Sequence, residues 1–452
     1  MTVQTPSPTD TALADALDEL AAADKWTFSA WTAREYAHGL FQYPAMMVPQ
    51  MQRELLAELR RAAGSTSLYD AFVGSGTTLA EAMLEGLDFL GTDVNPLAIL
   101  LCRAKAGPYF ITALGAAGER VCAAAGADRG TEIELDWEGW EKWFRLDVAQ
   151  ALSKLRRAIQ SESHQHSRRF LWVSLAETVR LTSNSRTSTV KLHMRPGGEI
   201  EGRVLDPLTS FRKIFERNLD RFAAQRDELR SENLLTQAGY YRGEVELHLH
   251  DVSSGPAPAA GVESCALLLT SPPYGDNVTT VPYGQAAYLP LQWIDLEDID
   301  EACDERFLAS THAIDAMSLG APLKGALDAV EPLRASSPSL DGILSELEAE
   351  PRDRQMRVAA FWRDLDASID HILASLSPGA LMGWTVGNRR VGQRQVPMDG
   401  ILTELFVKRG CEPVTTLERK IPDCRKRMAS RNSIAATMNA EKVLVLRTAP
   451  AA

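Results

Sequence analysis

Two short motifs carry residues whose types and spacing fit the binding of a small molecule and the transfer of a chemical group. The first, DAFVGSGTT at residues 70–78, places two glycines between an apolar segment and a segment of helical character. Glycine lets the backbone turn tightly and approach a ligand, and the N–H groups at a helix start favour an anionic group. The second, TSPPY at residues 270–274, ends another apolar segment. The first motif predicts a ligand-binding turn, and the second predicts a rigid acceptor site.

An acidic residue that follows the first motif indicates which ligand the turn binds. Asp93 ends the next predicted strand, where a carboxylate can accept hydrogen bonds from ribose hydroxyls. Phe72 offers an aromatic face to a purine or to a sulfonium cation. The chain contains neither GxGxxG nor GxxxxGK(S/T), the patterns typical of dinucleotide and nucleoside triphosphate sites. These residues predict an adenosine-containing cofactor, and the alternative is a strand-to-helix turn with a structural role only.

The second motif suits the methylation of an aromatic amine. Pro272 and Pro273 make the chain rigid and have no N–H to donate, so the carbonyl groups around Ser271 remain free as acceptors. Such acceptors can hold an amino group, while the ring of Tyr274 stacks on a base and the nitrogen faces the methyl donor. The alternative is a rigid turn with a buried tyrosine.

Together the two motifs resemble those of the site-specific DNA methyltransferases that modify amino groups, at cytosine N4 or adenine N6. The hallmarks of that family are DPFxGSGTT and (S/D/N)PPY, and this chain is of the SPPY type, with Ala71 in place of the usual proline. The segments HGLFQYPAMMVPQ, VGNRR and RKRMASRNS are also similar to the family. The resemblance implies S-adenosylmethionine as cofactor. It also implies an α/β fold of class I, a Rossmann-like seven-stranded sheet with one antiparallel strand near an edge, together with a helical inserted domain.

The resemblance also assigns roles to residues of this chain. Catalysis falls to the four residues of the second motif, Ser271, Pro272, Pro273 and Tyr274. Cofactor binding falls to residues at the ends of the first three core strands and to one tyrosine before them: Tyr43, Asp70, Phe72, Gly74, Ser75, Gly76, Thr77, Thr78, Asp93, Val94, Asp251 and Val252.

The serine before the two prolines favours cytosine N4 as the methylated atom, because aspartate is more typical of adenine N6 enzymes. The interpretation is direct attack by the amino nitrogen of a flipped-out base. An adenine N6 enzyme is the first alternative, followed by an RNA guanine-N2 methyltransferase and an inactive DNA-binding subunit. Methylation at cytosine carbon 5 is a poor fit, since it needs a cysteine nucleophile, usually after proline, and no cysteine follows a proline here.

Alternating helical and strand patterns predict the elements that position these motifs. They include a helix near residues 43–62, strands at 67–72, 88–93, 245–251 and 266–270, and a helix near 137–159. The predicted units are an N-terminal lead and cofactor half (1–106), a helical insert that is a candidate for target recognition (107–243), a catalytic half (244–292), a second insert (293–355) and the rest of the core (356–452).

Composition limits the possible partners. The net charge of −12 argues against a nucleic acid, but basic residues exceed acidic ones between Arg389 and Arg431. The longest apolar runs fall short of the roughly 18 residues of a membrane span, and the N-terminus lacks a signal-peptide pattern, so a cytoplasmic protein is expected. The six cysteines are scattered, which predicts neither a metal site nor disulfides.

The resemblance to DNA methyltransferases makes double-stranded DNA the expected partner, with a cognate restriction endonuclease as a possible second one. Candidate contacts lie in polar or basic segments beside the expected cleft: Ser183, Asn184, Arg186, Lys191, Arg389, Arg390, Arg394, Arg425, Lys426, Arg427 and Arg431. The recognition sequence and the choice between monomer and homodimer stay open.

Overall fold

The protein is built on one central β-sheet with helices on both faces. The structure is a computed structural model that describes residues 7–22, 26, 35–258, 261–262, 264–421 and 438–450. In these residues the sheet has seven strands in the order β3-β2-β1-β4-β5-β9-β8. The strands are β1 Ser67–Asp70, β2 Asp88–Asp93, β3 Val245–Leu249, β4 Cys265–Thr270, β5 Leu376–Val386, β8 Glu412–Lys420 and β9 Ala440–Arg447.

Strand direction defines the fold. The strands β3, β2, β1, β4 and β5 pair in parallel, whereas β9 is antiparallel to both of its neighbours, β5 and β8. The single antiparallel strand therefore lies one place in from the edge, as expected from the resemblance. This topology is that of the class I methyltransferases, and the prediction of the fold class is confirmed.

Both faces of the sheet are buried at β4, which explains why this strand is a continuous apolar run. On β4, Leu267 and Leu269 belong to one hydrophobic cluster and Leu268 belongs to the other. Because successive strand residues point to opposite faces, each cluster is the core beneath one layer of helices. Helices must therefore cover both faces.

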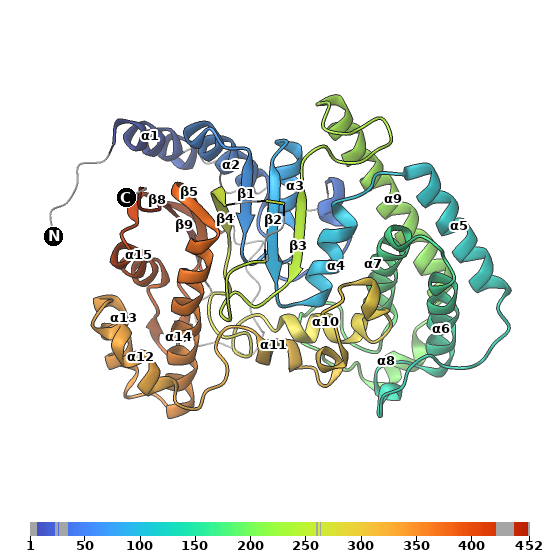
Figure 1. Cartoon of the computed structure of the whole chain (residues 1–452). Helices are drawn as coiled ribbons and strands as arrows, with labels where there is room; N and C mark the ends of the chain where they lie inside the picture. Colours follow the sequence, from blue (N-terminus) through green and yellow to red (C-terminus); the bar gives the residue numbers. More distant parts are fainter. Residues whose placement is uncertain are drawn as a thin grey trace.

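The first part of the chain forms α1 Pro8–Ala22, the 3₁₀ turn η2 Tyr36–Gly39, α2 Pro49–Ala63, α3 Thr77–Leu84 and α4 Pro96–Lys105. These helices pack against the sheet at two places, α2, α3 and α4 on strands β1 to β4 and α1 on β8 (Figure 1). In the next part, α5, α6, α7 and α9 gather beside α4 at the β3 end of the sheet, as Figure 1 shows. This part contains α5 Ile111–Ala127, η3 Trp140–Lys142, α6 Leu146–Gln160, α7 Gln165–Thr182, α8 Gly197–Gly202 and α9 Pro207–Ser231.

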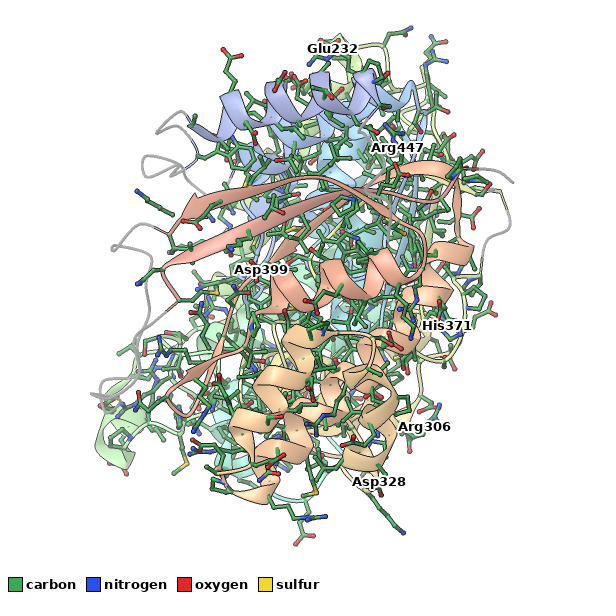
Figure 2. The ribbon with its side chains drawn as sticks, turned by 90° about the vertical axis from the view of Figure 1, so that its left-hand side faces the viewer. Glu232, Arg306, Asp328, His371, Asp399 and Arg447 are labelled. Atoms are coloured by element: carbon green, nitrogen blue, oxygen red, sulfur yellow. The ribbon has the colours of Figure 1, made fainter. Side chains whose placement is uncertain are left out.

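The chain after β4 is also largely helical. It forms α10 Tyr283–Leu291, η4 Leu296–Asp298, η5 Glu305–Leu308, α11 Ala313–Met317, α12 Ala326–Arg334, α13 Pro338–Leu347 and α14 Arg352–Ala374. After β5 come the short hairpin β6 Arg390–Val391 and β7 Arg394–Gln395, and then α15 Met398–Lys408. Figure 2 shows Asp399 at the start of α15 and Arg447 near α1, where they pair with Lys442 and Asp10 respectively.

Two predicted helices differ from those observed. The helix expected near residue 43 begins only at Pro49, because Val48 is extended before the proline and the proline occupies the first helical turn. The helix expected across 137–159 is interrupted. Trp140 lies in a single 3₁₀ turn, and α6 begins at Leu146, so the tryptophans of this segment do not share one helix face.

The described residues contain neither a membrane-spanning helix nor a metal-binding cluster. No helix in this part of the chain is long and apolar enough to cross a membrane. In the same residues, no group of three or more His, Cys, Asp or Glu side chains is arranged to hold a metal ion.

Candidate active site

A single cavity of about 1130 Å³ lies at the carboxyl ends of the five parallel strands. Ligands of open α/β sheets bind at this edge. All four predicted catalytic residues line the cavity: Ser271, Pro272, Pro273 and Tyr274. Nine of the predicted cofactor residues also line it: Tyr43, Phe72, Gly74, Ser75, Thr77, Asp93, Val94, Asp251 and Val252. The structure thus brings the two motifs to one space, although about 200 residues separate them in the sequence.

The two glycines of the first motif serve different purposes. Gly74 faces the cavity at φ +48°, and a Cβ atom there would lie 3.7 Å from Cε1 of Tyr43. Gly76, at φ +71°, faces the other way, and a Cβ atom on it would lie 2.8 Å from Sγ of Cys102 on α4. Gly76 is therefore required for packing of the loop against α4, and it is not among the residues that line the cavity.

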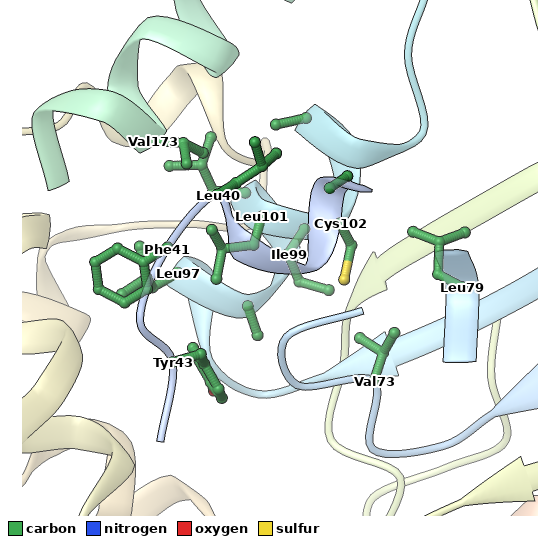
Figure 3. Packing of buried hydrophobic residues seen from close by; sticks show 14 of the residues in the cluster. Leu40, Phe41, Tyr43, Val73, Leu79, Leu97, Ile99, Leu101, Cys102 and Val173 are labelled. Atoms are coloured by element: carbon green, nitrogen blue, oxygen red, sulfur yellow. The ribbon is translucent and has the colours of Figure 1, made fainter. Parts of the chain in front are cut away.

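Buried groups on α4 support the loop from behind. Nζ of Lys105 donates a hydrogen bond of 2.6 Å to the carbonyl oxygen of Ser75, and burial lowers the pKa of this lysine to about 8. In Figure 3, Cys102 on the same helix lies in the core that also contains Tyr43 and Val73. No sequence pattern indicates this role for Lys105, because a lysine at a helix end is usually a surface residue.

Asp70 and Thr78 are fully buried and do not line the cavity, contrary to expectation. Oδ1 of Asp70 accepts hydrogen bonds from Oγ1 of Thr270 at 2.6 Å and from the backbone N–H of Phe72 at 3.1 Å. Burial raises the pKa of Asp70 to about 6. Asp70 therefore joins the ends of β1 and β4, and its role is to hold the two motifs together.

Asp93 lines the cavity with both of its oxygens in use. Oδ2 accepts from the backbone N–H of Gly74, and Oδ1 accepts from that of Asn95, both at 2.8 Å. Burial raises the pKa of Asp93 to about 6, although these hydrogen bonds act in the opposite direction. Each carboxylate oxygen keeps a second lone pair, so Asp93 can still accept hydrogen bonds from ribose hydroxyls.

Sequence reasoning missed an aromatic pair beside Asp93. Tyr43 stacks on Tyr283 of α10, with ring centroids 5.8 Å apart and an interplanar angle of 29°. The hydroxyl of Tyr43 also accepts a hydrogen bond of 3.0 Å from Nδ2 of Asn95. Tyr283 and Asn95 line the cavity as well. No pattern could reveal the pair, because its two tyrosines are distant in sequence.

Asp251 lies two residues beyond β3, at the same edge of the sheet. Its Oδ1 accepts hydrogen bonds from the backbone N–H of Ser253 at 2.9 Å and from its hydroxyl at 2.7 Å. Asp251 and the buried Val252 both line the cavity. The turn at this strand end therefore keeps the carboxylate beside the cavity.

In the second motif, two hydroxyls form a short chain. Oγ of Ser271 donates to the hydroxyl oxygen of Tyr274 at 3.4 Å, and Tyr274 donates to Oε1 of Glu441 on β9 at 3.4 Å. A Cβ atom on Gly387, after β5, would lie 2.6 Å from the ring of Tyr274. A glycine at position 387 therefore leaves the space that the tyrosine ring occupies.

The loop after Tyr274 is held by ion pairs that involve Arg389, one of the predicted DNA contacts. Asp276 is 2% exposed and accepts hydrogen bonds from the backbone N–H of Thr279 at 3.0 Å and from Nη1 of Arg389 at 3.1 Å. Nη1 of Arg357 lies 3.6 Å from the same carboxylate. Arg389 thus forms an ion pair with Asp276, and we do not propose it as a DNA contact.

Three other predicted DNA contacts form hydrogen bonds or an ion pair within the protein. Ser183 and Asn184 are buried, and their side chains donate to the carbonyl oxygens of Arg180 and Lys142. Arg394 pairs with Glu350 at 3.0 Å. These side chains hold loops in place, so they are not retained.

The remaining predicted contacts fall into two groups. Arg186, Lys191 and Arg390 are exposed, as a DNA contact requires. The basic residues Arg425, Lys426, Arg427 and Arg431 lie outside the described residues.

The second insert adds a wall that the sequence did not indicate. Ile314 of α11, Ser318 and Leu319 line the cavity opposite the strand ends. Residues 293–355 therefore take part in shaping the site.

Comparison with known proteins gives one relative along nearly the whole chain. The type II methyltransferase M.MvaI of Kocuria varians is 29% identical over 436 residues, which cover 92% of this chain and 91% of the relative. The type II methyltransferase M.MjaII of Methanocaldococcus jannaschii is 31% identical over 80 residues, 18% of this chain and 15% of that protein. No protein-family model matches the chain.

Among solved structures, the rRNA methyltransferase aviRa from Streptomyces viridochromogenes is 11% identical over 90% of this chain and 86% of its own. The TM-score between the two structures is 0.27. The sheet topology defines the chain as a class I methyltransferase fold. The chain is similar along nearly its whole length to a type II methyltransferase, and its methyl donor is S-adenosylmethionine.

Proposed function

We propose that the protein is a site-specific DNA methyltransferase that transfers a methyl group from S-adenosylmethionine to N4 of a flipped-out cytosine. The observation that carries this proposal is the shared cavity, which the glycine loop, Asp93 and the SPPY motif all line. Its volume of about 1130 Å³ exceeds that of an ordinary small-molecule site. There is room for a cofactor and a base together.

The residues present fit the cofactor. Gly74 leaves a cradle beside Tyr43, Asp93 offers acceptors to ribose hydroxyls, and Asp251 lies at the next strand end. When bound, S-adenosylmethionine supplies an electrophilic methyl group on a sulfonium sulfur. The glycine loop and Asp93 would hold the donor so that its methyl group faces the SPPY side of the cavity.

The SPPY residues would hold the base. The ring of Tyr274 stacks on it, which contributes about 1 to 3 kcal/mol in comparable sites. Oγ of Ser271 donates to Tyr274 and keeps its lone pairs for an N–H of the amino group. The amino nitrogen then attacks the methyl carbon directly, without a covalent bond between enzyme and base.

Cytosine is favoured because Ser271 is neutral and its SPPY context is the form more typical of cytosine N4 enzymes. Adenine N6 is the second candidate, since the same acceptors would suit either amino group. For the DNA we propose contacts by the exposed Arg186, Lys191 and Arg390, and by the basic residues around Arg425. Similarity to type II methyltransferases supports DNA as the substrate and a cognate restriction endonuclease as a partner.

Mass spectrometry of nucleosides tests the proposal. The purified protein and S-adenosylmethionine are incubated with unmethylated genomic DNA, and a reaction without the donor serves as control. N4-methylcytosine is the expected product. N6-methyladenine would replace the proposed base by the second candidate. If neither base appears while calorimetry shows that the donor binds, DNA amino methylation is wrong.

A further inference from the structure

Transfer of a methyl group to an amino nitrogen creates a proton that must leave. The nitrogen forms a bond to the methyl carbon, the carbon–sulfur bond breaks with its electron pair on sulfur, and the nitrogen then carries one hydrogen too many. In the SPPY motif itself no carboxylate is present to take this proton, because position 271 is serine.

The structure places a carboxylate at the end of a hydrogen-bonded chain that starts at this serine. Oγ of Ser271 donates to Tyr274 at 3.4 Å, and the Tyr274 hydroxyl donates to Oε1 of Glu441 at 3.4 Å. All three residues line the same cavity. The donors point in one direction, from serine to tyrosine to glutamate, so the lone pairs of Ser271 remain available to the amino group.

We propose that Ser271, Tyr274 and Glu441 form a proton relay that removes the amino proton during methyl transfer. This inference rests on the proposed function. The amino group gives its proton to Oγ of Ser271, Ser271 gives its own to the Tyr274 oxygen, and Tyr274 gives its own to Glu441. One proton leaves the base and one arrives at the carboxylate, so the step is balanced.

The surroundings of the relay keep its members in the required states. Burial, reinforced by the charge of Glu441, raises the pKa of Tyr274 well above its ordinary value, so the phenol stays protonated as a relay requires. Arg419 is 4% exposed, pairs with the other oxygen of Glu441, and donates to the carbonyl oxygen of Trp26 at 2.9 Å. Arg419 thus fixes the glutamate beside Tyr274. Glu441 acts through Tyr274 and is a positioning residue and final acceptor.

Two conservative variants and their combination test the relay. Tyr274→Phe keeps the stacking ring and removes the hydroxyl, and Glu441→Gln keeps the shape and removes the charge. Glu412→Gln, at the far end of the same hairpin, is the matched control for the loss of one charge. Single-turnover methyl transfer to DNA is measured for each protein, together with the dissociation constants of S-adenosylmethionine and DNA.

A relay predicts that each variant slows transfer at least tenfold and that the double variant is no slower than the slower single one. The reason is that both changes interrupt one pathway. The dissociation constants should stay within about twofold of the wild-type values, and Glu412→Gln should transfer at the wild-type rate. A merely structural role would instead weaken binding and give rate effects that multiply.

The wild-type reaction separates this inference from the proposed function. If wild-type protein methylates DNA and Glu441→Gln does so at the same rate, the relay is wrong and the proposed function stands. If the wild-type protein transfers no methyl group to DNA, the relay and the proposed function are both wrong.

Discussion

Asp93 and Gly74, nineteen residues apart, are joined by a hydrogen bond of 2.8 Å from the glycine N–H to Oδ2 of the aspartate. The bond ties the end of β2 to the loop that follows β1, so the shape of the glycine loop depends on the same carboxylate that is proposed to hold the ribose.

Replacing Asp93 by asparagine should therefore weaken binding of S-adenosylmethionine by about 1.5 to 3 kcal/mol, the range for hydrogen bonds to a charged group. Calorimetry measures the effect, with Asp328→Asn on the surface of α12 (Figure 2) as control. Since the pKa of Asp93 is raised to about 6, wild-type affinity should also fall as the pH drops below 6. Asp93→Asn should lose that dependence, and an unchanged pH profile would contradict the assignment.

The burial of Asp70 predicts a pH effect on stability. Its folded pKa of about 6 lies above the unfolded value of about 3.9. The folded protein thus binds more protons between these values, and stability decreases as the pH rises from 4 to 6. Asp70→Asn keeps an acceptor for Thr270, so it should raise the free energy of unfolding at pH 7 by on the order of 1 to 3 kcal/mol. Urea unfolding at pH 4.5 and 7 tests this, and equal destabilisation at both would refute it.

Gly76 should matter for stability through Cys102. Alanine at position 76 would bring Cβ to 2.8 Å from the sulfur at a positive φ, which costs about 1 to 3 kcal/mol from overpacking, beyond the backbone strain. In the Gly76→Ala, Cys102→Ala double variant the clash is removed. Urea unfolding should show that the double variant loses less than the sum of the two single losses. Simple additivity would mean that the two residues do not compete for space.

Arg389 and Arg390 are neighbours with different expected roles. Arg390→Gln should weaken binding to all duplexes and lower the slope of log K against log salt by about 0.9 for one lost phosphate contact. Arg389→Gln should leave that slope unchanged and slow methyl transfer, because it frees the loop held by Asp276. Fluorescence anisotropy between 50 and 200 mM salt distinguishes the two variants. The reverse pattern would return Arg389 to the DNA interface.

Ser271→Ala should slow methyl transfer more than it weakens DNA binding. Its hydroxyl is needed chiefly when charge builds on the amino nitrogen, and groups that act mainly in the transition state change kcat. Single-turnover rates and DNA dissociation constants are measured together, with Ser231→Ala at the exposed end of α9 as a control for the loss of a hydroxyl. An effect on binding as large as that on rate would contradict this role.

The sequence was sufficient for the core of the fold and for the two motifs that meet in the cavity. Apolar runs ending in DAFVGSGTT, Asp93 and SPPY predicted the strands correctly, because a parallel sheet buried on both faces makes each strand a continuous apolar run. Residues whose role depends on orientation were not predictable. The direction of Gly76 toward Cys102, the burial of Asp70 and the pairing of Arg389 with Asp276 arise from contacts between distant segments.

The hydrogen bond between Asp70 and Thr270 spans 200 positions of the chain. Closing so long a loop costs conformational entropy before any contact offsets it, and folds dominated by such contacts form slowly. When only the segment up to β2 has been synthesised, the glycine loop exists without the strand that must lie beside it. Methyl-transfer activity should therefore be among the last properties to appear during refolding, later than helix content, which makes it a sensitive reporter of complete assembly.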